Sequence, residues 1–202
     1  AAKEAFPYYT SFDPYLDLGD IAFEYEDGYW KEDVIGRSTP DFFGGYTNTF
    51  TWKQFTLTAL FTFSYGNDLI YQKDVSDSGM SSLANRGTRV LNHYSETNTS
   101  SNRPRSMWAA TYMLTSLNVY DASYLKLKTL TLNYNLPASI CQKVKIKSAS
   151  IYGTATNVFT ITSYPGPDPE VSDDPTSVIG GGRDVSTYPT VKSYTFGIRI
   201  NF

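Results

Sequence analysis

The chain has little of the chemistry on which most enzymes and metalloproteins depend. Its 202 residues include one histidine and one cysteine, Cys141. A lone cysteine rules out an internal disulfide framework, and one histidine beside one cysteine leaves no zinc-ligand set. Motifs for a serine nucleophile, a phosphate loop or a dinucleotide fold are also absent. The sequence therefore predicts no catalytic site, no metal and no cofactor, and the protein is not expected to be an enzyme.

The chain also lacks a long apolar run, a basic net charge and a signal peptide, and these absences limit its possible partners. No run of about 18 apolar residues occurs, which argues against a transmembrane helix. The net charge of -3 and the isoelectric point near 5.1 argue against a nucleic-acid partner, which usually needs a basic patch. Residues 1–10 lack the basic start and apolar run of a signal peptide. We therefore expect the chain to be the downstream part of a longer protein.

Aromatic residues, by contrast, are abundant. They make up 16% of the chain, with 17 Tyr and 12 Phe, yet the mean hydropathy stays negative at -0.34. Outer-membrane β-barrels combine these properties, because only alternate strand residues meet lipid and polar loops dilute the average. The composition is thus compatible with a membrane-spanning sheet.

The last segment, 190–202, alternates without a break between apolar and polar or small residues. The apolar set is aromatic at both ends and aliphatic in the middle, which is typical of a strand that crosses a bilayer. A soluble antiparallel sheet with one wet face would alternate in the same way. The apolar set is Tyr194, Phe196, Ile198, Ile200 and Phe202, and the opposite set is Ser193, Thr195, Gly197, Arg199 and Asn201.

Two earlier segments, 41–66 and 124–160, each predict a pair of antiparallel strands. In the second pair the leucines change phase, since Leu125 and Leu127 are out of step with Leu130. A bulge near Lys128 would bring them onto one face. Alternatively, only the second set meets lipid, and Lys126 and Lys128 lie beyond the bilayer.

The connections between the strands alternate in length. Two short turns are expected at 53–54 and 137–147, and a short helix is expected over 81–92. Short turns at one end and long loops at the other are the topology of an outer-membrane barrel, with short periplasmic turns and long extracellular loops. The predicted fold class is therefore an all-β, transmembrane antiparallel β-barrel segment of about five strands. Its long extracellular loops are 1–40, 67–122 and 161–189.

The first loop carries carboxylates that could ligate calcium. They lack the spacing with which an EF-hand-type loop wraps one ion. A solvated acidic surface is the favoured interpretation, and calcium binding stays open. The residues are Asp17, Asp20, Glu24, Glu26, Asp27, Glu32 and Asp33.

Several collinear segments resemble the C-terminal end of the SusC/RagA family of TonB-linked outer-membrane proteins. The family usually carries a calcium-loop-like segment before its Val-Ile-Gly motif, and Tyr25-Glu-Asp-Gly28 stands in that place here. The segments that carry the resemblance are 34–36 (Val-Ile-Gly), 39–42 (Thr-Pro-Asp-Phe), 61–68 (Phe-Thr-Phe-Ser-Tyr-Gly-Asn-Asp), 124–137 (from Tyr-Leu-Lys-Leu-Lys to Asn-Leu-Pro), 157–160 (Asn-Val-Phe-Thr), 168–170 (Asp-Pro-Glu) and 188–202.

The resemblance implies a barrel of about 22 strands with a plug domain, energised through TonB and covered by a SusD-like surface lipoprotein. Such proteins lie in the outer membrane of Bacteroidetes-type bacteria and import oligosaccharides or, in some members, peptides. A chain of about five strands cannot close a barrel, so the plug and the TonB-interacting segment are expected elsewhere. A secreted carbohydrate-binding β-sandwich and a passive porin are the competing hypotheses.

Substrate contacts are expected at the loop ends of the strands, where aromatic faces and planar polar groups meet. Each of these side chains could instead have a purely structural role, for example in an aromatic girdle. Phe202 is the expected signal for barrel assembly. The substrate-binding candidates are Tyr65, Asn67, Asp68, Trp108, Tyr112, Tyr164 and Asp168.

Overall fold

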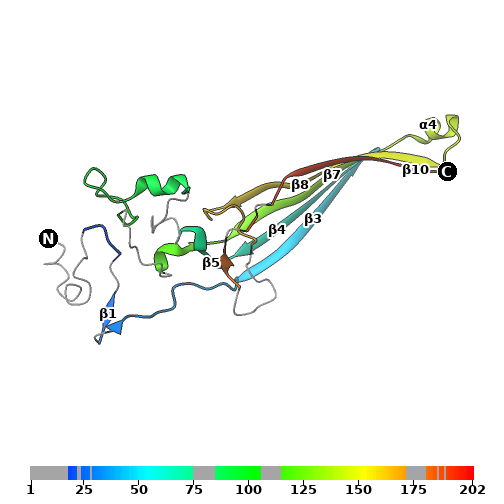
Figure 1. The fold of residues 1–202 in the computed structure, drawn as a ribbon. Coiled ribbons are helices and arrows are strands. Elements are labelled where there is room, and N and C mark those ends of the chain that lie inside the picture. The colour runs from blue at the N-terminus through cyan, green and yellow to red at the C-terminus, as the bar shows by residue number, and fades with distance from the viewer. Residues whose placement is uncertain are drawn as a thin grey trace. The chain divides into compact units, whose positions relative to one another are not determined.

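The structure is a computed structural model, and it describes residues 18–21, 24–27, 29–74, 85–105, 115–171, 181–185, 187–188 and 190–202. The chain forms two compact units (Figure 1). One consists of Ala1–Ile35 with Tyr71–Asn118, and the other of Gly36–Ile70 with Val119–Phe202. We call the first the loop unit and the second the sheet unit.

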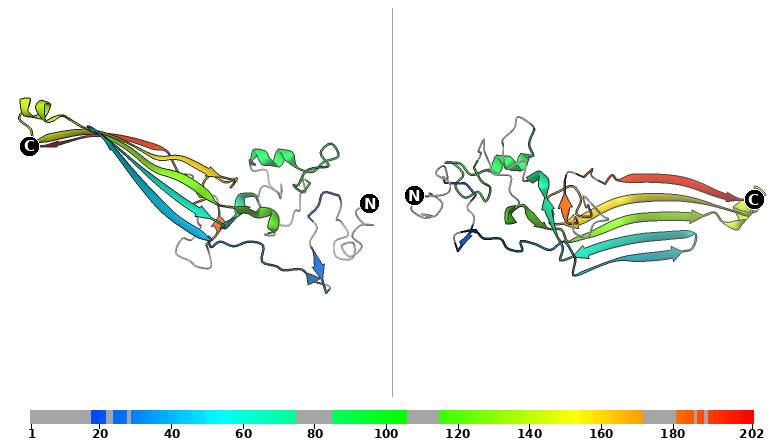
Figure 2. Two further views of the ribbon diagram at one scale, coloured as in Figure 1. Left: turned by 180° about the vertical axis from the view of Figure 1, so that it is seen from behind. Right: turned by 60° about the horizontal axis from the view of Figure 1, so that its bottom comes forward.

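The sheet unit is built on five long antiparallel strands in the order β10-β8-β7-β4-β3 (Figure 2). Every neighbouring pair is antiparallel. The strands lie where the alternating pattern predicts them, although β8 continues two residues further than expected and β10 begins three residues later than expected. Their bounds are β3 Phe42–Trp52, β4 Phe55–Tyr65, β7 Tyr124–Asn135, β8 Ser148–Thr162 and β10 Ser193–Asn201.

The register of the strands gives the sheet one apolar face and one polar face. On the apolar face, Leu57 lies between Phe50 and Leu132. The next position on the polar face is a row of threonines that crosses all five strands, and two neighbouring pairs are hydrogen-bonded, at 3.3 and 3.0 Å between hydroxyl oxygens. The row consists of Thr49, Thr58, Thr131, Thr154 and Thr195.

The predicted bulge in β7 is present. The register of β7 shifts against β8 between Leu127 and Thr129, and its register against β4 shifts at the same level. Across the shift on β8, Asn157 has a positive φ of 51°, a conformation that asparagine tolerates better than most residues. The bulge at Lys128 therefore returns Leu125 and Leu127 to the apolar face.

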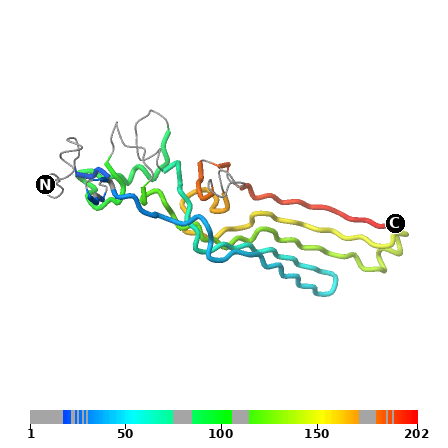
Figure 3. The backbone as a smooth tube through the Cα atoms, turned by 90° about the horizontal axis from the view of Figure 1, so that it is seen from below, coloured from blue at the N-terminus to red at the C-terminus, as the bar shows by residue number. Residues whose placement is uncertain are grey.

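The two short connections and the C-terminus lie at one end of the sheet (Figure 3). Lys53 and Gln54 form the tight turn, with a φ of 52° at Lys53. The segment 137–147 was predicted as a simple turn, and this was wrong, because it contains the helix α4 (Ala138–Lys143). The amides of Ile140 and Cys141 both donate to the carbonyl of Pro137, so the chain turns helical directly after the proline.

The opposite end of the sheet also has regular structure that the alternation did not predict. A small sheet in the order β6-β5-β9 forms there from Asp68–Tyr71 (β5), Val119–Asp121 (β6) and Arg183–Asp184 (β9). The segments 67–122 and 161–189, which the sequence predicts as long loops, therefore contain three short strands among their described residues. Strands of two to four residues are too short to show a period of two.

In the loop unit, the elements whose two ends are both described are short. The unit contains a pair of two-residue strands, β1 (Tyr25–Glu26) and β2 (Tyr29–Trp30), and the 3-10 helices η1 (Thr88–Asn92) and η2 (Ser116–Asn118). Within the described residues, the helix expected over 81–92 is the 3-10 helix η1, and residues 81–84 lie outside the described part of the chain. Across the described segments, no helix is long and apolar enough to cross a membrane.

Among the described residues of the sheet unit, no apolar core covers the apolar face of the strands. That face stays exposed along its length, from Phe50 on β3 to Phe196 and Ile198 on β10. A soluble β-sandwich would cover such a face with a second sheet. The few buried side chains lie toward the two ends and are polar as often as apolar. They are Asn67, Leu69, Ala122, Lys126, Leu127, Cys141, Ala149, Ser150, Tyr164, Asp168 and Asp184.

Candidate functional site

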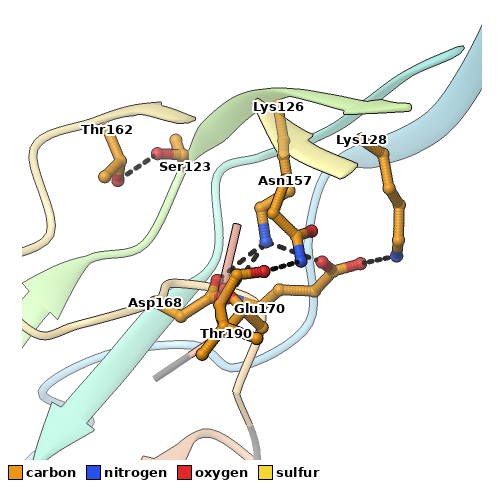
Figure 4. A network of polar contacts seen from close by, with 9 residues as sticks. Ser123, Lys126, Lys128, Asn157, Thr162, Asp168, Glu170 and Thr190 are labelled. Atoms are coloured by element: carbon orange, nitrogen blue, oxygen red, sulfur yellow. Dashed lines mark hydrogen bonds and ion pairs between the residues drawn. The ribbon is translucent and has the colours of Figure 1, made fainter. Parts of the chain in front are cut away.

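A buried ion cluster lies on the polar face, at the end of the sheet away from the C-terminus (Figure 4). The Lys126 ammonium donates to both carboxylate oxygens of Asp168, at 2.9 and 3.1 Å, and to Glu170 Oε2 at 2.8 Å. Lys126 has no solvent exposure and Asp168 only 2%. Lys128 donates to the other Glu170 oxygen at 2.8 Å. Two lysines of β7 therefore bind two carboxylates of the long connection 161–189.

Neighbouring hydrogen bonds fix the same connection to the strands. The Glu170 amide donates to Asp168 Oδ1 at 2.9 Å, and the Thr190 hydroxyl donates to the other Asp168 oxygen. The Asn157 side-chain amide donates to the Val191 carbonyl at 2.9 Å from the bulged part of β8. The two ends of the connection are thus fastened at one place, next to the bulge.

The carboxyl groups of this cluster are held in their charged form. Burial by itself would raise the pKa of Asp168, but hydrogen bonds from Thr190, the Glu170 amide and Lys126 outweigh it and lower the pKa below its ordinary value. Burial opposes ionisation of Glu170 as well, and hydrogen bonds from Lys126 and Lys128 lower its pKa. Both carboxylates of the cluster are therefore ionised at neutral pH.

A second anchor lies in the same connection. The Tyr164 hydroxyl donates to Asp184 Oδ2 at 2.8 Å, and the Thr187 amide donates to Asp184 Oδ1 at 3.2 Å. A Cβ atom added to Gly166 would come within 2.3 Å of the Tyr164 ring, so this close approach requires glycine. The Tyr164 side chain therefore packs against other residues of the connection 161–189.

A pocket of about 550 Å³ adjoins the ion cluster. Its lining includes Phe43 from β3, Thr62 and Ser64 from β4, Tyr124 from β7, and Glu170. By register, Phe43 is paired with Ser64 and Ser64 with Tyr124, so these side chains share the polar face. The pocket therefore opens at the polar face of the five-stranded sheet.

The structure places three predicted substrate contacts at the end of β4 in structural positions. Tyr65 lies on the apolar face, stacked on Phe42 with ring centroids 5.1 Å apart, as a girdle residue would be. Buried Asn67 accepts a hydrogen bond from Ser64 at 2.7 Å, and Asp68 accepts one from the Arg37 amide at 2.9 Å. Asn67 also lines the pocket described above, whereas substrate contact by Tyr65 and Asp68 stays a prediction without support from their geometry.

The remaining candidates divide into two groups. Tyr164 and Asp168 are 5% and 2% exposed, and their polar groups are engaged in the anchors described above. Trp108 and Tyr112 lie outside the described residues. The sequence interpretation missed Phe43 and Lys126 as site residues. Phe43 carries a detectable signal, because it is an aromatic residue on the polar phase of its strand.

Metal ligation finds no support in the described segments, where no group of three or more histidine, cysteine, aspartate and glutamate side chains could hold an ion. In the acidic first loop, Lys31 donates to Glu24 at 3.1 Å, and Asp20 is paired with Arg105. Asp17 and Gly28 lie outside the described residues.

The curated proteins that this chain resembles are TonB-dependent receptors. TonB-dependent receptor P3 of Formosa agariphila is 34% identical over 173 residues, which are 84% of this chain and 17% of the receptor. TonB-dependent receptor P26 of the same organism is 27% identical over 179 residues, covering 84% of this chain and 18% of the receptor. No family model matches the sequence.

Solved structures of the RagAB peptide importer have the same fold. The open-open state matches with a TM-score of 0.71 and 28% identity, covering 89% of this chain and 19% of that chain. A second RagAB structure matches at 0.68 and 30% identity, covering 82% of this chain and 17% of that one. The chain belongs to the TonB-dependent receptors of the SusC/RagA type.

Membership in this family accounts for the open sheet. The chain spans less than a fifth of the length of the curated relatives that it matches. Its five strands are a segment of a β-barrel wall, and the unpaired edges of β3 and β10 belong to a sheet that continues in a complete barrel.

Proposed function

We propose that this chain forms part of the wall and loops of an outer-membrane importer for a bulky polar nutrient, energised through TonB. The observation that carries the proposal is the two-faced sheet, with an exposed apolar face on one side and a row of threonines on the other. The apolar face suits lipid and the polar face suits a water-filled lumen. No chemistry is required of the chain beyond shape and contact.

The orientation follows from the two ends of the sheet. The end with the tight turn, α4 and Phe202 is assigned to the periplasm, and the end with the ion cluster and the small sheet is assigned to the cell surface. TonB would act through parts of the protein outside this chain. A SusD-like surface lipoprotein is the proposed partner at the loops, as the family resemblance implies.

Oligosaccharides are the proposed substrates. The loop end of the polar face combines ring side chains with neutral hydroxyl and amide groups, such as Phe43, Ser64 and Asn67. Peptide import is the second candidate, and a specific observation favours it, since the solved relatives are described as a peptide importer.

The test is growth of the parent bacterium after removal of the gene. Single neutral glycans serve as the sole carbon source, and uptake of labelled oligopeptides is measured in parallel. The wild-type gene restores function in one control strain, and an Ile198→Arg copy is the matched assembly-defective control. The proposal predicts a defect on at least one glycan. A defect confined to oligopeptides would transfer the assignment to peptide import, and normal uptake of both would contradict the importer itself.

A further inference from the structure

Phe43 is an exception to the division of the sheet into two faces. Its side chain is 76% exposed. Within the five strands, every other large apolar side chain that is exposed lies on the apolar face, as the register shows. The other large apolar or aromatic side chains of that face, Leu60, Tyr124 and Tyr152, are half-buried, whereas the Phe43 ring is exposed. It is therefore available for a ligand in the lumen.

The surroundings of Phe43 define a site with mixed chemistry. Pro40, Pro169 and Tyr124 add flat apolar surface to the pocket, while Thr62, Ser64 and Asn67 add neutral polar groups. Pockets for small molecules combine aromatic surface with a few placed polar groups in this way. A ligand here would lay an apolar face on rings and present hydrogen-bonding groups at its edge.

Charge at the pocket is balanced. Glu170 lines it, but its two oxygens accept hydrogen bonds from Lys126 and Lys128 at 2.8 Å each. Just before the pocket residue Ser38, Arg37 forms an ion pair with Asp41. Glu170, which lines the pocket, and the nearby Arg37 thus each have partners of opposite sign, and the Asp68 carboxylate accepts a hydrogen bond from the Arg37 amide. The site favours an uncharged ligand, because an ion would have to compete with these pairs.

The walls of the pocket are held in place by backbone hydrogen bonds. The Asp41 amide donates to the Tyr65 carbonyl at 2.8 Å, which fixes the chain between Pro40 and Phe43. The Ile70 amide donates to the Gly182 carbonyl at 2.8 Å, which fixes the opposite wall. A site that is already formed loses less conformational entropy when a ligand binds.

We propose that the Phe43 pocket is a sugar-binding subsite that stacks one neutral pyranose ring of an oligosaccharide on the Phe43 ring. The inference rests on the proposed import function and names the chemistry of one contact within it. A pyranose presents an apolar face of C–H groups and a rim of hydroxyl groups, which matches the rings and neutral polar groups of the pocket. Its lack of charge matches the balanced ion pairs.

The experiment measures equilibrium binding to the complete protein by calorimetry. The probes are maltoheptaose, cellohexaose and mannohexaose, with hexagalacturonate and an uncharged ten-residue peptide as comparators. For the neutral sugar that wild type binds, Phe43→Ala is expected to weaken affinity about tenfold, as for loss of an aromatic contact. Phe43→Trp is expected to retain affinity. Phe50→Ala is the matched control, because Phe50 lies on the other face of the same strand and is 62% exposed.

Several outcomes would overturn the subsite. Equal sugar affinity of the wild type and Phe43→Ala would overturn the subsite. The proposed import function would still hold in that case, because sugar uptake is measured separately. Tighter binding of hexagalacturonate than of any neutral sugar contradicts the neutral ligand. Binding of the peptide alone, or of none of the probes, overturns the sugar assignment. Loss of sugar affinity in Phe50→Ala equal to that in Phe43→Ala would show that the effect is not local to the pocket.

Discussion

The two faces of the sheet are made by the same five strands and differ in almost every property. The apolar face exposes rings and aliphatic side chains in neighbouring rows, such as Phe196 beside Gly153 and Ile198 beside Ile151. The polar face carries a row of threonines, a buried ion cluster and a pocket. A soluble monomer rarely exposes a continuous apolar face of this kind. The difference between the two faces indicates that the apolar face of the barrel wall contacts lipid.

The largest expected effect comes from breaking the ion cluster on the polar face. Lys126→Met would leave Asp168 buried without its cation, and we expect a loss of about 3–5 kcal/mol in stability. The measurement is the denaturant midpoint of the complete protein in detergent. Lys128→Met is the matched control, because Lys128 is 42% exposed, and its loss should be about 0–1 kcal/mol. Equal effects of the two substitutions would contradict the role of burial.

The apolar face is tested by placing a charge where lipid is expected. Ile198→Arg should block assembly or cost about 2–4 kcal/mol if the residue lies near the middle of the bilayer. Thr195→Arg is the matched control on the polar face of the same strand. The readout is the amount of folded, heat-modifiable protein in isolated outer membranes. The assignment of the faces fails if Thr195→Arg is as harmful as Ile198→Arg.

Acid should weaken the cluster on the polar face and leave the apolar face unchanged. The pKa values of Asp168 and Glu170 are lowered in the fold, from ordinary values of 3.8 and 4.5. Such groups stabilise the fold fully above their unfolded-state pKa, and this contribution is lost as the pH falls through the lowered folded pKa. The melting temperature of the wild type should therefore fall more steeply below pH 3.8 than that of an Asp168→Asn, Glu170→Gln variant. If the melting temperatures of the wild type and the variant fall in parallel with pH, the ion cluster is not the cause of the acid sensitivity.

The smallest effect on stability is expected at the C-terminus. Phe202 follows the last paired residue of β10, Asn201, and is 81% exposed. Its deletion should leave the melting temperature of assembled protein unchanged but lower the amount that reaches the outer membrane. Quantitative blotting of membrane fractions measures this. Unchanged surface levels would show that Phe202 is not an assembly signal.

Much of the fold could be predicted from the sequence, because period-two alternation over nine to fifteen residues is a strong local signal. The phase change of the leucines left two alternatives open, and one of them, a bulge near Lys128, is present. The site could not be predicted in the same way. Lys126 and Asp168 are 42 positions apart, and nothing local in either segment identifies the other. Strands as short as β9 carry no period, and the Tyr164 hydroxyl is bonded to Asp184, 20 positions away.

The measurement that tests the central claim most directly is site-directed spin labelling along β10 in the complete protein, reconstituted in bilayers. Labels at Phe196, Ile198 and Ile200 should collide with oxygen, which concentrates in lipid. Labels at Thr195 and Arg199 should collide with a water-soluble nickel chelate. Gly197 is left out, because an added Cβ would lie 2.4 Å from the Tyr152 ring. Accessibility that alternates with a period of two is the predicted result, and equal access of the nickel chelate to both sets would contradict the barrel wall.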